Sequence, residues 1–201
     1  WNAMEFLNPE YPNYQQRIDF VHQQNAKLMI SLWANFGPST KPFATLKEKG
    51  LLFTAETWPT GAGVKPYNPY SAEARDIYWS YLWNGLVNKG IDAYWMDSTE
   101  PDFFGTESDK DNVALPGQTW RSLRNAFPLA TVQGVSQHHR AQSELADRRV
   151  SIMTRSGYLG MQRTGAYVWS ADINARWDVL RAQIPAACNL SESGLPYWNS
   201  D

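Results

Sequence analysis

A group of carboxylates that directly follows one short apolar segment gives this chain its clearest chemical signal. The segment 91–96 leads straight into Asp97, Glu100 and Asp102, and Trp95 stands just before the first of these acids. In α/β barrels, catalytic side chains lie at the C-terminal ends of the strands. Aromatic faces also pack well against the C–H surfaces of sugar rings. We therefore expect Asp97 to lie at the tip of a strand, beside a carbohydrate pocket.

A second carboxylate occupies a similar position later in the chain. Asp172 follows the apolar segment 167–169 and, like Asp97, has a tryptophan two or three residues upstream. Hydrolysis of a glycosidic bond usually needs two carboxylates that face the scissile bond. An aspartate after a strand also commonly caps the next helix. Spacing alone therefore leaves both interpretations open for the pair.

These carboxylates need strands to position them, and the chain alternates between helical and strand-like segments. Periodicity predicts helices over 14–25, 41–50, 71–90, 118–126 and 175–190, and short apolar runs predict strands over 28–33, 91–96, 149–154, 167–169 and 195–198. Ser71 and Gly90 suit the two ends of the third helix, and Pro185 is expected to kink the last helix or end its first half. Helices alternating with buried strands indicate an α/β fold. Because a closed barrel has eight strands, about five strands predict an incomplete central portion of a (β/α)8 TIM barrel.

Composition excludes several classes of function. The net charge is −2 and the lysines and arginines are spread along the chain, so there is no basic footprint for nucleic acid. No apolar run approaches the roughly 20 residues that cross a bilayer, and the chain opens without a signal peptide. The 10 tryptophans and 10 tyrosines exceed what a core of this size needs, so we expect some of them to line a carbohydrate cleft. Cellular location and oligomeric state stay open.

Metal and thiol chemistry are not expected. His138 and His139 are adjacent, so they point in different directions on a helix, and no third ligand with zinc spacing follows. Cys188 is the single cysteine, which excludes an intramolecular disulfide, and we expect it to be a small buried apolar residue. The sequence contains no phosphate-binding glycine loop and no serine triad motif. The predicted chemistry therefore needs no cofactor and no metal.

Three motifs, in a fixed order, resemble the signatures of glycoside hydrolase family 31. The first is Tyr94-Trp95-Met96-Asp97-Ser98-Thr99-Glu100-Pro101; the second runs through Thr154-Arg155-Ser156, Gly160-Met161-Gln162-Arg163 and Val168-Trp169-Ser170-Ala171-Asp172; the third is the start of a motif over 193–201. His22, Asn25-Ala26 and the segment 29–33 also fit the helix and strand that precede the first signature. The resemblance covers essentially the whole chain.

The resemblance implies a retaining α-glycosidase. Asp97 would be the nucleophile that forms a covalent glycosyl-enzyme, and Asp172 would be the general acid and then the general base. That chemistry places the two carboxyl groups about 5–5.5 Å apart, against roughly 6.5–9.5 Å in an inverting enzyme. Arg155 would contact sugar hydroxyls and keep nearby carboxylates ionised. A purely structural ion pair is the alternative role for Arg155.

Other residues take supporting roles through the same resemblance. Glu100 would position the nucleophile loop, Arg163 would be a partner of the carboxylates, and Asp201 is a candidate substrate ligand. Asp102 is either a residue of the outer rim or simply solvated. The candidate walls of the sugar pocket are four tryptophans, for each of which core packing is the alternative: Trp33, Trp95, Trp169 and Trp198.

The resemblance also assigns each part of the chain to a part of the catalytic domain. All of 1–201 would belong to one catalytic barrel domain, with a helix and strand over 1–33, a loop insertion over 34–70, the helix and nucleophile strand over 71–102, and the acid/base strand and later elements over 103–201. Both ends fall inside motifs, so we expect a piece of a longer protein. With two unpaired sheet edges, this piece should be poorly stable or inactive alone.

Two positions depart from the family pattern, and two alternatives remain for the function. Ser98-Thr99 stands where the family often has Met-Asn, and Ala171 stands where glycine is usual, which restricts φ. The form of the first signature is most similar to the α-xylosidase branch, which trims xyloglucan fragments. An α-glucosidase or transglycosidase acting on α-glucan fragments is the near alternative. A non-catalytic carbohydrate-binding relative with the same aromatic pocket is the distant one, and the presence of Asp97, Asp172 and Arg155 together argues against it.

Overall fold

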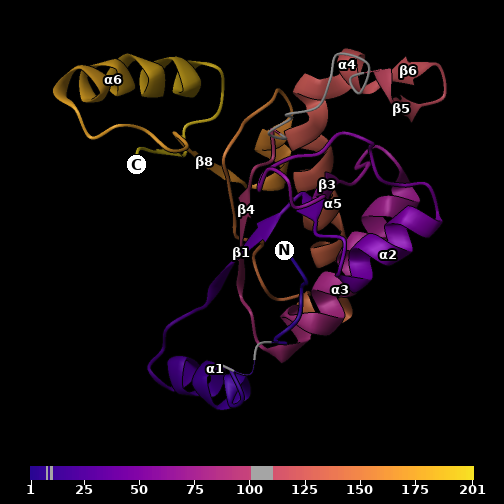
Figure 1. The fold of residues 1–201 in the computed structure, drawn as a ribbon. Helices are drawn as coiled ribbons and strands as arrows, with labels where there is room; N and C mark the ends of the chain where they lie inside the picture. Colours follow the sequence, from indigo (N-terminus) through magenta and orange to yellow (C-terminus); the bar gives the residue numbers. More distant parts are fainter. Residues whose placement is uncertain (8, 10, 101–110) are drawn as a thin grey trace.

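A parallel sheet forms the centre of the molecule. Over residues 1–7, 9, 11–100 and 111–201, which the computed structural model describes, the main sheet has five strands in the order β1-β4-β7-β8-β9. Their bounds are β1 Met29–Trp33, β4 Ala93–Asp97, β7 Ile152–Thr154, β8 Tyr167–Trp169 and β9 Trp198–Asn199. All four pairings are parallel and follow the chain order. Every strand therefore ends at the same edge of the sheet (Figure 1). The sheet confirms the prediction of an incomplete α/β barrel.

Helices and, among the described residues, two small antiparallel strand pairs flank this sheet. The α-helices are α1 Tyr14–Gln23, α2 Lys41–Glu48, α3 Ala72–Gly85, α4 Trp120–Leu123, α5 Phe127–Ala141 and α6 Trp177–Glu192. The 3-10 turns are η1 Val87–Lys89, η3 Arg124–Ala126, η4 Ser143–Leu145 and η5 Met161–Thr164, and the antiparallel pairs are β2 Asn35–Phe36 with β3 Lys65–Pro66 and β5 Val113–Leu115 with β6 Gln118–Thr119. In Figure 1, α3 and α5 lie together on one side of the sheet, with α2 against α3, whereas α1 and α6 extend at opposite ends. No described helix combines the length and the apolar character needed to cross a membrane.

The two faces of the sheet have different environments. Alternate strand residues such as Leu32, Tyr94 and Ile152 are fully buried against α3 and α5. Residues between them point the other way, and Trp95 on that second face is 38% exposed. Because successive side chains of a strand alternate between faces, the open face is the one that would line the interior of a closed barrel. Asp97 shares this face with Trp95.

Helix α3 shows how the sequence builds the covered side. The Ser71 hydroxyl accepts the Ala74 N–H at 3.3 Å and caps the first turn, as expected. Tyr78 and Leu82 then lie on the buried stripe of the helix. The helix ends at Gly85, a short 3-10 turn follows, and Gly90 adopts a left-handed φ of 114° before β4. This glycine allows the chain to reverse from helix to strand within a few residues.

The structure corrects several details predicted for the later helices. The segment 118–126 contains a hairpin strand, the short α4 and a 3-10 turn, and the long helix begins only at Phe127, where Pro128 is tolerated in the first turn. Of the two outcomes expected at Pro185, an end to the helix is excluded, because α6 continues past this residue to Glu192. Cys188 is exposed, because no residue of α6 is buried. The apolar stripe that predicted burial is real, but nothing in the described part of the chain covers it.

Candidate active site

Asp97 is the last residue of β4, and a tight turn holds its carboxylate. The Ser98 N–H donates to Asp97 Oδ1 at 2.7 Å, and Ser98 itself adopts a left-handed φ of 49°. In the sheet, Asp97 pairs with Trp33 of β1 on one side. On the other side Arg155, the first residue after β7, brings its Nη1 to 3.4 Å from Asp97 Oδ1. The Asp97 side chain is 18% exposed, so it is shielded but still reachable from the open face.

Arg155 lies between two carboxylates. Its guanidinium forms a close ion pair with Glu100 through Nε and Nη2, while Nη1 faces Asp97. The Arg155 side chain is 11% exposed, so water screens these interactions less than it would at the surface. The structure therefore brings Asp97, Glu100 and Arg155 together at the C-terminal edge of the sheet.

Opposing effects act on the Asp97 carboxyl, and the net result is a raised pKa. Burial contributes most, because it disfavours the charged form. The negative charges of Glu100 and Asp172 also raise the pKa of Asp97, whereas the Arg155 charge and the Ser98 N–H lower it. Asp172 is therefore among the charged groups that act on the Asp97 carboxyl. A pair of this kind, flanked by a cation, can support attack at one carbon and proton transfer to a neighbouring oxygen.

Asp172 lies just beyond β8 at the same C-terminal edge of the sheet, and it is exposed to solvent. Ala171 before it adopts a left-handed φ of 61°, a conformation that glycine adopts without penalty and other L-residues avoid at a cost of roughly 1–2 kcal/mol. Ser170 anchors this turn, because its N–H donates to the Asn199 carbonyl and its Oγ accepts the Asp201 N–H, both at 3.0 Å. Asp201 is thereby held beside the Asp172 turn.

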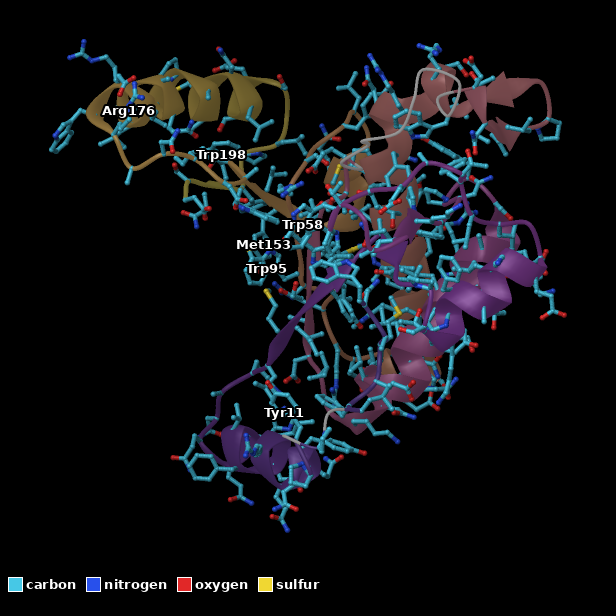
Figure 2. The ribbon with its side chains drawn as sticks, viewed as in Figure 1. Tyr11, Trp58, Trp95, Met153, Arg176 and Trp198 are labelled. Atoms are coloured by element: carbon cyan, nitrogen blue, oxygen red, sulfur yellow. The ribbon has the colours of Figure 1, made fainter. Side chains whose placement is uncertain are left out.

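The four predicted tryptophans have different environments. Trp95 and Trp169 meet edge to face with ring centroids 5.8 Å apart; Trp169 is buried and Trp95 is open. Trp198 is partly buried at the start of β9. Figure 2 shows Trp95 with Met153, its partner in the sheet register, on the side of the sheet away from α3 and α5. Trp33 stacks against a further tryptophan, Trp58, with centroids 5.5 Å apart.

Sequence reasoning missed Trp58 and Trp1 as members of this site. The Trp1 ring lies edge to face with Trp33 and with Trp58, with ring centroids 4.8 Å apart in each pair, and the Trp1 Nε1 donates to Asn35 Oδ1 at 2.9 Å. The three indoles form an aromatic cluster next to the strand that pairs with Asp97. Trp58 lies in the irregular segment between α2 and β3, where the many turn residues gave no sign of a structural role. The one sequence signal that could have identified Trp58 as a candidate is a large aromatic residue within a polar loop.

Some predicted residues are not part of the cluster. Arg163 is an exposed residue of η5, its carbonyl accepts from Arg140 Nη1 at 3.2 Å, and within the described ranges it forms no ion pair with a candidate catalytic carboxylate. Asp102 lies outside the described residues. His139 is buried on the covered side, where its Nδ1 and the Tyr94 hydroxyl are 2.8 Å apart. Among the described side chains, no group of three His, Cys, Asp or Glu residues is arranged to hold a metal ion.

Comparison with known proteins identifies this arrangement. The family model for the glycosyl hydrolases family 31 TIM-barrel domain matches residues 1–201. An alpha-xylosidase of Saccharolobus solfataricus is 37% identical over 100% of this chain and 26% of its own length, and an alpha-glucosidase of the same organism is 28% identical over 95% of this chain and 31% of its own length. The crystal structure of the GH31 alpha-xylosidase from Xanthomonas citri superposes with a TM-score of 0.87 at 34% identity, covering 100% of this chain and 23% of that one.

The chain thus spans less than a third of the length of each of these relatives, and the match extends over the strands that carry Asp97, Arg155 and Asp172. Its parallel sheet, its strand order and the family match agree: this chain belongs to glycosyl hydrolase family 31 and forms part of its TIM-barrel domain.

Proposed function

We propose that the protein containing this chain is a retaining α-glycosidase that releases non-reducing terminal α-xylosyl residues from oligosaccharides. The observation that carries the proposal is the position of Asp97, which ends β4 beside Arg155 and within the electrostatic influence of Asp172. Two carboxylates at the C-terminal edge of a barrel sheet are the groups that double displacement at an anomeric carbon requires. Neither step of that chemistry requires a cofactor.

In the first step, the ionised Asp97 carboxylate attacks the anomeric carbon while Asp172 donates a proton to the leaving oxygen. The bond to the leaving group breaks, and a covalent glycosyl-enzyme forms at Asp97. In the second step, Asp172 removes a proton from water, which attacks the same carbon and releases Asp97. Arg155 supports both steps, because its charge favours the ionised form of Asp97 and its position suits hydrogen bonds to sugar hydroxyls.

The choice of xylose rests on the relatives. Two of the proteins compared, at 37% and 34% identity, are named alpha-xylosidases, whereas the alpha-glucosidase is 28% identical. An α-glucosyl substrate is therefore the second candidate. A panel of aryl α-xyloside and aryl α-glucoside, hydrolysed by the full-length protein, separates the two. A higher kcat/KM for the glucoside would reverse the assignment of the glycone.

Substitution of the two carboxylates tests their roles. Asp97→Ala should abolish hydrolysis of every glycoside, because no nucleophile remains. Asp172→Ala should slow substrates with a poor, alkyl leaving group by about 10²–10⁴-fold and affect a nitrophenyl leaving group much less, because a good leaving group does not need a proton. Asp76→Ala is a suitable control, since Asp76 is a surface residue paired with His138. Unchanged turnover in Asp97→Ala would exclude the proposed nucleophile. If the wild-type protein itself bound oligosaccharides without hydrolysing them, it would be a carbohydrate-binding relative.

A further inference from the structure

Three hydroxyl groups join the turn that carries Asp97 to the turn that carries Arg155. Thr99 Oγ1 is 2.7 Å from Thr154 Oγ1 and 3.0 Å from Ser156 Oγ, and Thr154 Oγ1 donates a long, 3.5 Å hydrogen bond to the Ser156 carbonyl. Thr99 and Thr154 are both fully buried. One direction satisfies every donor: Ser156 donates to Thr99, Thr99 to Thr154, and Thr154 to the carbonyl. We call these three side chains the hydroxyl knot.

The hydroxyl knot lies where the main-chain ladder between the two strands stops. The register of β4 with β7 ends at the pair Met96 and Thr154. One residue later, the Arg155 N–H reaches the Met96 carbonyl only at 3.4 Å, which is a weak contact. Beyond that point, within the described residues, the direct links between the turns are the knot and the ion pairs of Arg155 itself.

The positions of the knot residues relative to the charged groups are specific. Thr154 and Ser156 flank Arg155 on both sides, and Thr99 directly precedes Glu100 and lies two residues after Asp97. A buried hydroxyl costs free energy unless it is hydrogen-bonded, and valine has nearly the same shape as threonine without that cost. Satisfied buried polar networks favour a single arrangement of the chain. The hydroxyls therefore fix one spacing between the Asp97 and Arg155 turns.

We propose that Thr99 is a positioning residue, whose hydroxyl holds the Arg155 turn against the Asp97 turn and so keeps the guanidinium beside the nucleophile. This inference rests on the glycosidase function proposed above. The attraction between two charges falls as their separation grows, so a looser Arg155 turn weakens the interaction that favours the ionised form of Asp97. The ionised form is the one that attacks the sugar.

The test compares Thr99→Val with Thr99→Ser in the full-length protein. In the pH profile of kcat/KM, Thr99→Val should move the acid limb to higher pH. On the plateau of the same profile, kcat/KM should fall by about fivefold, the effect of one net hydrogen bond. Thr99→Ser, which keeps the hydroxyl, should restore the wild-type limb. Ser156→Ala removes one arm of the knot from a less buried position, so it should shift the limb in the same direction even if Thr99→Val fails to fold.

Thr131→Val is the matched control. Thr131 is equally buried, and its Oγ1 lies 2.6 Å from the Tyr67 hydroxyl on the covered side of the sheet. The Thr131→Val variant should lose about as much thermal stability as Thr99→Val, and the acid limb of its pH profile should stay unchanged. A knot variant that loses activity equally at all pH values, as an ordinary destabilised protein would, overturns the proposal.

A second readout is independent of turnover. Carbodiimide modifies protonated carboxyl groups, so peptide mass spectrometry of Asp97 after labelling across a pH series reports its pKa directly. Thr99→Val should shift this labelling midpoint to higher pH, and an unchanged midpoint overturns the role of Thr99. If the wild-type protein hydrolyses neither aryl glycoside, the glycosidase proposal fails while the labelling still decides the role of the knot.

Discussion

At the scale of single residues, the Asp97 carboxyl responds to charges of both signs. Its pKa is raised chiefly by burial, further raised by Glu100 and Asp172, and lowered by Arg155 and by the Ser98 N–H. In the proposed mechanism Asp97 must be ionised to attack, so these opposing contributions set the lower pH limit of the proposed activity. Each neighbour can be altered separately, and the direction of the shift identifies its contribution.

Glu100→Gln should move the acid limb of kcat/KM to lower pH, the opposite direction from Thr99→Val. The substitution removes a negative charge that raises the pKa of Asp97, and it leaves Arg155 freer to face Asp97. Glu73→Gln is the control, because Glu73 also forms an ion pair, with Lys49 on the surface. The measurement is the pH profile of an aryl glycoside. A limb that rises in Glu100→Gln would show that Glu100 acts mainly by orienting Arg155.

At the scale of elements, the segment between β1 and α3 does more than connect them. The Thr57 N–H donates to the Val64 carbonyl at 3.0 Å, and the Gly63 N–H donates to Glu56 Oε1 at 3.0 Å, so hydrogen bonds on both sides hold the loop around Trp58. The loop places Trp58 on Trp33, next to the strand that ends in Asp97. A held aromatic ring at this rim suits the face of a sugar.

Trp58→Ala should raise KM by roughly 2- to 13-fold, the equivalent of the 0.5–1.5 kcal/mol of one aromatic contact, with kcat nearly unchanged. The reason is that stacking on a sugar ring stabilises the bound substrate and the transition state alike. Trp83→Ala provides the comparison, since Trp83 stacks on Trp79 in α3, with ring centroids 6.3 Å apart and a similar angle between the rings. A fall in kcat without a change in KM would show that Trp58 supports the turn structure instead.

The elements also show what the sequence could predict. The strands ending at Asp97 and before Arg155 and Asp172 were predictable, because a short apolar run followed by polar residues is a local signal. The start of α5 at Phe127 was not, since the hairpin before it is bound by a residue distant in sequence, Asn68, whose side chain donates to the Ala114 carbonyl at 2.8 Å. Cys188 was placed wrongly because periodicity shows an apolar face and not whether another element covers it. Trp58 was missed because its contact with Trp33 spans a loop of irregular structure.

At the scale of the whole molecule, the C-terminal and N-terminal ends of the strands have different roles. The C-terminal edge carries the candidate active site. Near the opposite edge, the Asp92 carboxylate is only 8% exposed and lies 2.8 Å from His22 Nε2 and 3.0 Å from the Leu28 nitrogen, whose N–H donates to it. It thereby ties α1 to the starts of β1 and β4. In barrels of this type, such features at the N-terminal face serve stability.

Asp92→Asn should destabilise the protein by roughly 1–3 kcal/mol near neutral pH. Burial alone would raise the pKa of Asp92, but the Leu28 N–H, His22 and Lys27 outweigh it and hold the pKa below the ordinary 3.8. A lowered folded-state pKa contributes stability that is present above the unfolded-state value and lost as the pH falls through the folded-state value. The difference in Tm between wild type and Asp92→Asn should therefore narrow below about pH 3.8.

Asp76→Asn gives the necessary contrast. Asp76 also pairs with a histidine, His138, at 2.9 Å, but its side chain is 68% exposed. An exposed pair contributes about 0–1 kcal/mol, so this variant should melt close to wild type at every pH. Equal destabilisation by Asp76→Asn and Asp92→Asn would show that burial of Asp92 does not determine its contribution.

The packing of Trp1, Trp33 and Trp58 also has an optical consequence. Indoles with ring centroids 4.8–5.5 Å apart couple their electronic transitions, which produces paired bands of opposite sign in circular dichroism. Because this group borders the strand pairing with Asp97, a ligand that reorients one ring alters the coupled signal. The protein therefore carries an intrinsic spectroscopic reporter at the rim of its candidate active site, readable without any label.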